Sequence, residues 1–170
     1  MAHQAGCIAA VAMPIVMGWT SRAGAQPPVL WQFDYMQSRF AVSQALKRAA
    51  TRLAHGDCHN VLADFTDETG RSLSTTLAGT GRTAVEEFRL LRFVDDRRAP
   101  QCRAGTTLAF TQTGSRLIRV CGPQFRDRFQ QNRTTTEIVV IHEFLHSLGL
   151  GENPPSSHAI TEQVVVRCGG

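Results

Sequence analysis

Residues 134–158 read TTTEIVVIHEFLHSLGLGENPPSSH, and this stretch determines which fold and which site the chain can have. Apolar residues dominate its first half and recur at helical spacing, as in a helix that runs through a core. Any of Thr134–Thr136 can cap that helix, and Glu137 then falls in its first turn, where a negative charge suits the helix dipole. Gly149 can adopt the left-handed conformation that ends a helix sharply. The stretch therefore predicts a buried helix that is followed by a tight turn.

Two histidines of this helix are four residues apart. His142 and His146 lie one turn apart and project from the same face, so both imidazoles can reach one ion. Zinc binds neutral imidazole at about 2.0–2.1 Å, and a catalytic zinc site keeps one position for water. Glu143 sits beside the metal-facing edge, where it can take a proton from the attacking water and later give it to the leaving amine. The HExxH spacing thus predicts one catalytic Zn²⁺ ion, with both histidines as ligands and Glu143 as general base.

The string His142-Glu143-x-x-His146-x-x-Gly149-x-x-Glu152 resembles the signature of the metzincin and snapalysin-like zinc metallopeptidases. In those zincins the helix stops at the glycine, and the chain turns back to present a third ligand. That ligand is histidine in metzincins and aspartate in snapalysin-like peptidases. Glu152 stands at this position here, and a carboxylate is a normal zinc ligand. The resemblance implies that Glu152 completes the metal site.

The segments before this helix also resemble the deuterolysin-type aspzincins. In those peptidases, strands similar to LAFT (108–111) and IRVC (118–121) precede a helix similar to VVIHEFLH (139–146). The resemblance covers about 107–152. It implies an α+β, zincin-like fold in which a leading helix and the active-site helix pack on a small mixed sheet. It also implies that an edge strand of the hairpin borders the cleft and pairs with the extended backbone of a peptide or protein substrate.

The chain departs from these families in three respects. No methionine follows Met36, so the methionine turn of metzincins is absent. No tyrosine follows Tyr35, so a tyrosine that helps to hold the oxyanion is absent as well. The downstream GTxxD-type aspartate of aspzincins is also missing.

The third ligand therefore has rivals to Glu152 in the sequence. His158 lies beyond two prolines and is near enough to fold back, and Glu162 lies on the predicted last helix. Cys121 can also serve as a ligand if it is not in a disulfide. His158 and Arg167 are the candidates for stabilising an oxyanion.

The first 25 residues differ from the rest of the 170-residue chain. The apolar, uncharged run GCIAAVAMPIVMGW (6–19) precedes Ala23-Gly24-Ala25, which is the pattern of a cleaved secretory signal. We expect 1–25 to be a signal peptide, with cleavage after Ala25. Residues 26–170 then form a single domain, secreted or periplasmic, without a stable membrane span.

Cysteine usage agrees with export, because disulfides persist in oxidising compartments. Apart from Cys7 in the predicted signal, four cysteines permit three pairings. We favour Cys102–Cys121, since the segment between them reads as a hairpin that brings them together. Cys58–Cys168 is then the remaining pair.

The net charge of +4 is carried almost entirely by scattered arginines. No basic run or RNA-type aromatic motif accompanies them, so we expect no nucleic-acid partner. Periodicity and turn residues predict the remaining elements. These are a helix over 35–55, a helix or short strand at 61–65, a turn at 66–70, a helix over 83–91 capped by Thr83, a strand at 92–96, a hairpin of strands 107–111 and 117–121, and a last helix over 156–168 capped by Ser156 or Ser157.

These features together predict a secreted zinc peptidase that uses Glu143 as base. The alternative is a catalytically silent, zinc-stabilised domain that binds a partner or the cell envelope. A third hypothesis is a domain without a metal, in which the HExxH motif is coincidental.

Overall fold

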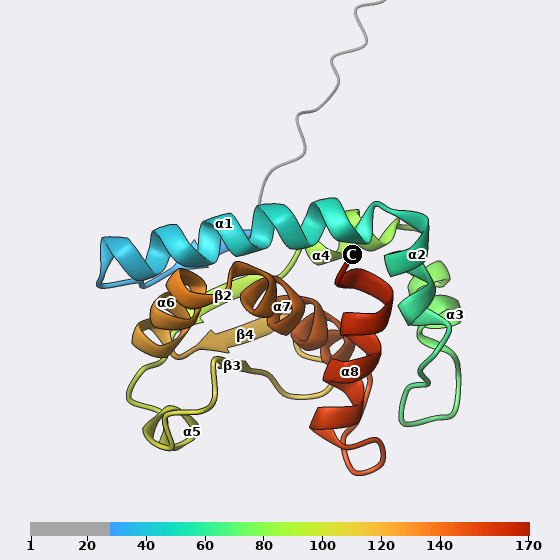
Figure 1. Cartoon of the computed structure of the whole chain (residues 1–170). Coiled ribbons are helices and arrows are strands. Elements are labelled where there is room, and N and C mark those ends of the chain that lie inside the picture. The colour runs from blue at the N-terminus through green and yellow to red at the C-terminus, as the bar shows by residue number, and fades with distance from the viewer. Residues whose placement is uncertain (1–27) are drawn as a thin grey trace, which may run out of the picture.

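The computed structural model describes residues 28–170, so the predicted signal peptide lies outside the described residues. The described chain has an α+β fold with eight α-helices and a small mixed sheet of four strands, which confirms the predicted fold class (Figure 1). The elements in chain order are β1 (Val29–Trp31), α1 (Met36–Leu53), α2 (Gly56–His59), the 3-10 helix η1 (Asn60–Leu62), α3 (Leu73–Ala78), α4 (Ala84–Phe88), β2 (Arg92–Asp95), α5 (Pro100–Arg103), β3 (Ala109–Phe110), β4 (Leu117–Val120), α6 (Gly122–Gln131), α7 (Arg133–Ser147) and α8 (Ser157–Cys168).

The sheet has the strand order β1-β2-β4-β3. β1 is parallel to β2, and β2 is parallel to β4. β3 runs antiparallel to β4, with Ala109 opposite Val120 and Phe110 opposite Arg119. The predicted hairpin is therefore present. β3 has one neighbour among the strands of residues 28–170 and is therefore an edge strand.

α7 is the buried helix that the sequence predicts, and it contacts α1, α6, α8 and β3. In Figure 1, α1 lies along one side of α6 and α7, while α8 crosses near the end of α7. Ten side chains of α7 are buried, and five of them are apolar: Thr136, Glu137, Ile138, Val140, Ile141, His142, Glu143, Phe144, Leu145 and His146.

The start of α7 differs from the prediction. The helix begins at Arg133 and is capped by Asn132, whose side chain accepts a hydrogen bond from the Thr135 N–H at 3.2 Å. Thr136 is buried instead, and its hydroxyl donates to the Arg133 carbonyl at 2.6 Å. Glu137 consequently lies beyond the first turn. Its side chain, 3% exposed, forms an ion pair with Arg52 of α1 at 2.7 Å, because a buried charge needs a partner.

Several shorter elements also differ from their predicted bounds. The strand predicted over 107–111 is reduced to β3, because the Thr111 hydroxyl donates to the Leu117 carbonyl at 2.7 Å and its backbone N–H bonds to Glu143. The segment 61–65 contributes only the end of η1, and α6 was not predicted at all. Thr83 caps α4 with a complete capping box, as predicted.

Both favoured disulfides are present, Cys102–Cys121 and Cys58–Cys168. The first closes a short segment, with a sequence separation of 19. The second joins α2 to the end of α8 across a separation of 110. Within 28–170, no helix is both long and apolar enough to cross a membrane.

The two disulfides should differ in their contribution to stability. All four cysteines are buried, at 4% exposure or less, so replacement by serine removes similar side-chain packing at each pair. The longer closed loop constrains the unfolded chain more. We expect Cys58→Ser/Cys168→Ser to lower the free energy of unfolding by about 5 kcal/mol and Cys102→Ser/Cys121→Ser by about 3 kcal/mol. Urea denaturation without reductant measures both losses, and equal losses would contradict the loop argument.

Candidate metal centre

Three side chains converge at the end of α7. Nε2 of His142 lies 2.9 Å from Nε2 of His146. Oε1 of Glu152 lies 3.2 Å from Nε2 of His146 and 3.6 Å from Nε2 of His142. Four-coordinate zinc with bonds of about 2.0–2.1 Å places its ligand atoms about 3.3 Å apart, so these separations suit a common ion. The group of His142, His146 and Glu152 can hold a metal ion.

Hydrogen bonds on the far side of each imidazole orient the two rings. Nδ1 of His146 lies 2.7 Å from the carbonyl oxygen of Leu150, and Nδ1 of His142 lies 3.0 Å from Oγ1 of Thr161. A carbonyl can only accept, so Nδ1 of His146 carries the proton and its Nε2 presents a lone pair to the site. Burial and the neighbouring His146 lower the pKa of His142 to about 4, although Glu152 opposes this shift. His142 is therefore neutral at pH 7, as a metal ligand must be.

The turn that returns Glu152 to the histidines is formed at Gly149. Two hydrogen bonds close α7, from the Gly149 N–H to the His146 carbonyl at 3.0 Å and from the Leu150 N–H to the Leu145 carbonyl at 3.2 Å. This is the pattern of a Schellman motif, which requires a positive φ at the residue after the cap. Gly149 has φ +106°, and a Cβ there would lie 3.1 Å from Cβ of Asp67. Glycine is thus required for both conformation and space.

A second segment supports this turn, and sequence reasoning missed its role. The N–H of Glu68 donates to the Gly149 carbonyl at 3.2 Å. Asp67 beside it is only 8% exposed, and its carboxylate accepts hydrogen bonds from Thr69, Arg71 and Thr76. The turn at 66–70 was predicted, but no local signal relates it to a segment so distant in the sequence.

Glu143 is buried next to the metal-binding group. Its side chain accepts a backbone hydrogen bond from Thr111, and its Oε2 has no hydrogen-bond partner among the described residues. Burial, together with the nearby Glu152, raises the pKa of Glu143 to about 8. The carboxyl group is thus an unsatisfied buried acid that a cation or a water molecule can stabilise.

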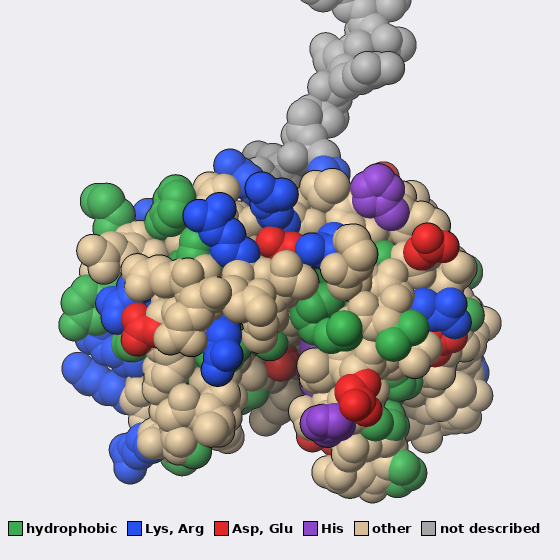
Figure 2. All heavy atoms as spheres, in the orientation of Figure 1, with side chains coloured by type: hydrophobic (Ala, Val, Ile, Leu, Met, Phe, Trp, Pro, Cys, Tyr) green, Lys and Arg blue, Asp and Glu red, His purple; other side chains and the backbone are tan. Residues whose placement is uncertain are grey.

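Glu143 and His142 line a cleft of about 440 Å³. Figure 2 shows a groove on this face, with acidic side-chain atoms visible in its floor and a basic side chain on its wall. The cleft lies between the β3 segment, α6, α7 and α8. Its lining residues are Thr106, Thr107, Leu108, Ala109, Arg128, Thr135, Val139, His142, Glu143, Ser157 and Thr161.

The rival ligands lie elsewhere. His158 and Glu162 are exposed on α8 and pair with each other at 3.2 Å. Arg167 makes a two-pronged ion pair with Asp64, at 2.7 and 2.8 Å, and Cys121 is in a disulfide. Glu152 is the candidate that the fold brings to the histidines, whereas His158 and Arg167 are engaged away from them.

Comparison with known protein families, with curated proteins and with solved structures finds no match. The function must therefore be argued from the metal-binding group and the cleft beside it.

Removal of one ligand should weaken metal binding selectively. We expect the wild-type chain to bind one divalent ion, and Glu152→Ala to weaken its affinity by about 100-fold or more, since even outer-shell partners contribute 10–100-fold. Glu162→Ala is the matched control and should bind as the wild type does. Zinc titration by calorimetry, with metal content by mass spectrometry, measures both. If Glu152→Ala binds zinc with the affinity of the wild type, Glu152 is excluded as a ligand.

The contribution of the Asp67 carboxylate to stability should depend on pH. The Thr69 hydroxyl, before other contacts, holds the pKa of Asp67 well below its ordinary value of 3.8. The carboxylate therefore stabilises the fold above pH 3.8, and this contribution is lost as the pH falls towards the lower folded-state pKa. Asp67→Asn should lower the melting temperature at pH 7. The difference in melting temperature between the variant and the wild type should become smaller below about pH 4. Thermal melts between pH 7 and 3 test this, and a constant difference would contradict it.

Proposed function

We propose that this chain is a secreted, zinc-dependent peptidase. The observation that supports it is the convergence of two imidazole nitrogens and a carboxylate oxygen beside a buried, partly unsatisfied glutamate at a cleft. Two histidines and one acidic residue form a donor set that suits zinc and leaves a position open for chemistry. His142 and His146 lie on the same helix as the candidate base Glu143, so the placement of these three side chains relative to one another is rigid.

His142, His146 and Glu152 would hold the zinc ion. When bound, zinc supplies Lewis-acid chemistry, because it polarises a carbonyl and lowers the pKa of water. Thr161 and Leu150 hold the two rings from behind, which keeps both Nε2 atoms directed at the site.

Glu143 would move the proton. Burial and Glu152 favour the protonated form of this group, and a metal ion held by the neighbouring ligands would favour the carboxylate form. The backbone hydrogen bond from Thr111 holds the carboxyl group, and the unpartnered Oε2 can accept a proton from the attacking water. The same oxygen can then donate this proton to the amine that leaves when the C–N bond breaks.

The free edge of β3 would bind the substrate backbone. The Leu108 carbonyl accepts a hydrogen bond from the Cys121 N–H at 2.9 Å, so the polar backbone groups of Leu108 face β4. Successive residues alternate in direction, which directs the N–H and C=O of Ala109 to the opposite edge, beside the cleft. An extended peptide can therefore pair there as an added strand.

The secreted location rests on two features. The two disulfides are typical of oxidising compartments, and the first 25 residues match the pattern of a cleaved signal. Both features are consistent with release from the cytosol.

Glu143→Gln separates catalysis from metal binding. The substitution keeps the side-chain size and removes the proton-accepting carboxylate, so we expect the rate of peptide hydrolysis to fall by about 10²–10⁴-fold. Metal content should remain that of the wild type. A quenched fluorescent peptide library, read by mass spectrometry, measures hydrolysis, with Glu162→Gln as the control. Near-normal hydrolysis by Glu143→Gln would exclude its role as the base.

The alternative, a silent metal-stabilised domain, predicts a different result from the same material. The wild type would then bind zinc, and its melting temperature would fall when the zinc is chelated. It would hydrolyse no peptide of the library. No zinc binding at all would mean that the HExxH motif is coincidental.

A further inference from the structure

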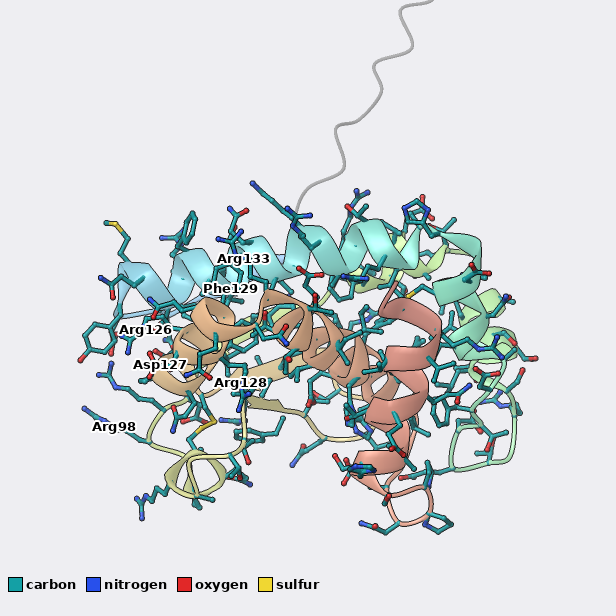
Figure 3. All side chains as sticks on the ribbon, viewed as in Figure 1. Arg98, Arg126, Asp127, Arg128, Phe129 and Arg133 are labelled. Carbon is teal, nitrogen blue, oxygen red and sulfur yellow. A yellow bond between two sulfur atoms is a disulfide. The ribbon has the colours of Figure 1, made fainter. Side chains whose placement is uncertain are left out.

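The cleft beside the metal-binding group is lined by a positively charged arginine that the proposed chemistry does not use. Arg128 of α6 lines the same cleft as His142 and Glu143. In Figure 3, Arg128 lies between α6 and β3, whereas Arg133 lies on the side of α1. A guanidinium in a peptide-binding cleft is a candidate for substrate recognition.

The neighbouring arginines are engaged, but Arg128 is not. Arg126 pairs with Asp127 at 2.7 Å, and Arg133 stacks on the Phe129 ring with 5.3 Å between its guanidinium carbon and the ring centroid. Arg128 has no hydrogen-bond or ion-pair partner for its side chain within residues 28–170. Its five N–H donors are thus available to a ligand.

The rest of the cleft lining favours an anion at this position. Glu143 is the one acidic residue among those that line the cleft, and its backbone partner is Thr111 rather than Arg128. Apart from His142 and Arg128, the other polar side chains there are five hydroxyls: Thr106, Thr107, Thr135, Ser157 and Thr161. A carboxylate matches the guanidinium fork, and hydroxyl groups can donate to it as well.

Strand direction determines which part of a substrate would meet Arg128. Thr111, which bonds to Glu143, marks the reacting end of the strand, and the cleft lining continues back through Ala109 to Thr106. A peptide that pairs antiparallel to β3 runs from the Thr111 end of the strand towards Thr106. Its C-terminal part then lies at the Thr106 end. The residues near Arg128 are then those after the scissile bond.

We propose that Arg128 makes this peptidase selective for a carboxylate on the C-terminal side of the scissile bond. The carboxylate is either an Asp or Glu side chain or the free C-terminus of a short peptide. This inference rests on the proposed peptidase function. Arg128 acts as a specificity-determining residue and takes no part in proton transfer.

The test uses pairs of peptides that differ by one group. One pair carries Glu or Gln one or two residues after the cleaved bond, and a second pair ends in a free carboxylate or an amide. We expect kcat/KM to favour one carboxylate over its neutral match by about tenfold, as is typical for a charge-assisted hydrogen bond. The pair that shows the preference identifies the source of the carboxylate.

Variants of the zinc-loaded protein assign the preference to Arg128. Arg128→Gln should reduce the tenfold ratio of kcat/KM, acidic over neutral peptide, to about one. The Arg128→Glu variant should hydrolyse a Lys peptide faster than the Glu peptide. Arg126→Gln removes an arginine from the same helix and should keep the wild-type ratio. High salt should weaken the preference, because it screens exposed charges.

A binding measurement separates failure of this inference from failure of the proposed function. Fluorescence anisotropy gives the affinity of labelled peptides for zinc-loaded Glu143→Gln and for Glu143→Gln/Arg128→Gln. If no peptide is hydrolysed by the wild type, the peptidase proposal fails, and a tenfold, Arg128-dependent affinity for the acidic peptide still supports the carboxylate site. If the wild type hydrolyses peptides and Arg128→Gln leaves the ratio of kcat/KM for acidic over neutral peptides unchanged, the inference about Arg128 is overturned. The peptidase proposal then still stands. A preference for acids before the cleaved bond would also overturn it.

Discussion

The turn at Gly149 is the constraint on which the metal-binding group depends. α7 directs His142 and His146 from one face, but two imidazoles alone do not make a closed set of ligands. The positive φ at Gly149 ends the helix and reverses the chain so that Glu152 reaches both rings. The same turn places the Leu150 carbonyl where it fixes the His146 ring. One backbone reversal thus supplies the candidate third ligand and the orientation of the His146 ring.

Packing keeps that turn and its helix in place. The carbonyl of His146 also accepts a hydrogen bond from the Gly114 N–H at 2.8 Å, so the β3–β4 hairpin loop is joined to the end of α7. At the other end of the helix, Glu137 pairs with Arg52, which donates as well to the Cys168 and Gly170 carbonyls. A buried ion pair adds little net stability, but removal of one partner would leave a charge buried. It therefore favours a single arrangement of α1, α7 and the C-terminal end of α8.

The environment of the site separates the roles of its acidic groups. Glu152 is 39% exposed and faces two imidazoles, which suits a ligand. Glu143 is buried at a cleft, where burial and Glu152 raise its pKa to about 8, and a cation bound beside it would lower that pKa. Arg128 lines the same cleft, where its positive charge would face a bound peptide. The proposed ligand, base and recognition group are thus distinguished by burial and partners rather than by residue type.

The sequence by itself determined the features that depend on local geometry. Helical spacing places His142 and His146 on one face, and glycine at 149 predicts the reversal, because both follow from the backbone of a few neighbouring residues. Cysteine count and hairpin pattern led to the disulfides, since few pairings were possible. The α+β class was implied by the family resemblance of the segment 107–152, while local periodicities predicted several of the individual helices and strands.

Only the tertiary structure decided how distant segments meet. The choice of Glu152 over His158 and Glu162 depends on the direction of the chain after α7, which ligand type does not encode. Neither the support by Asp67 nor the position of Arg128 in the cleft has a local signature, because each arises from the packing of segments far apart in the sequence. Side-chain chemistry is a property of the residue, but the partner that each group meets is a property of the whole fold.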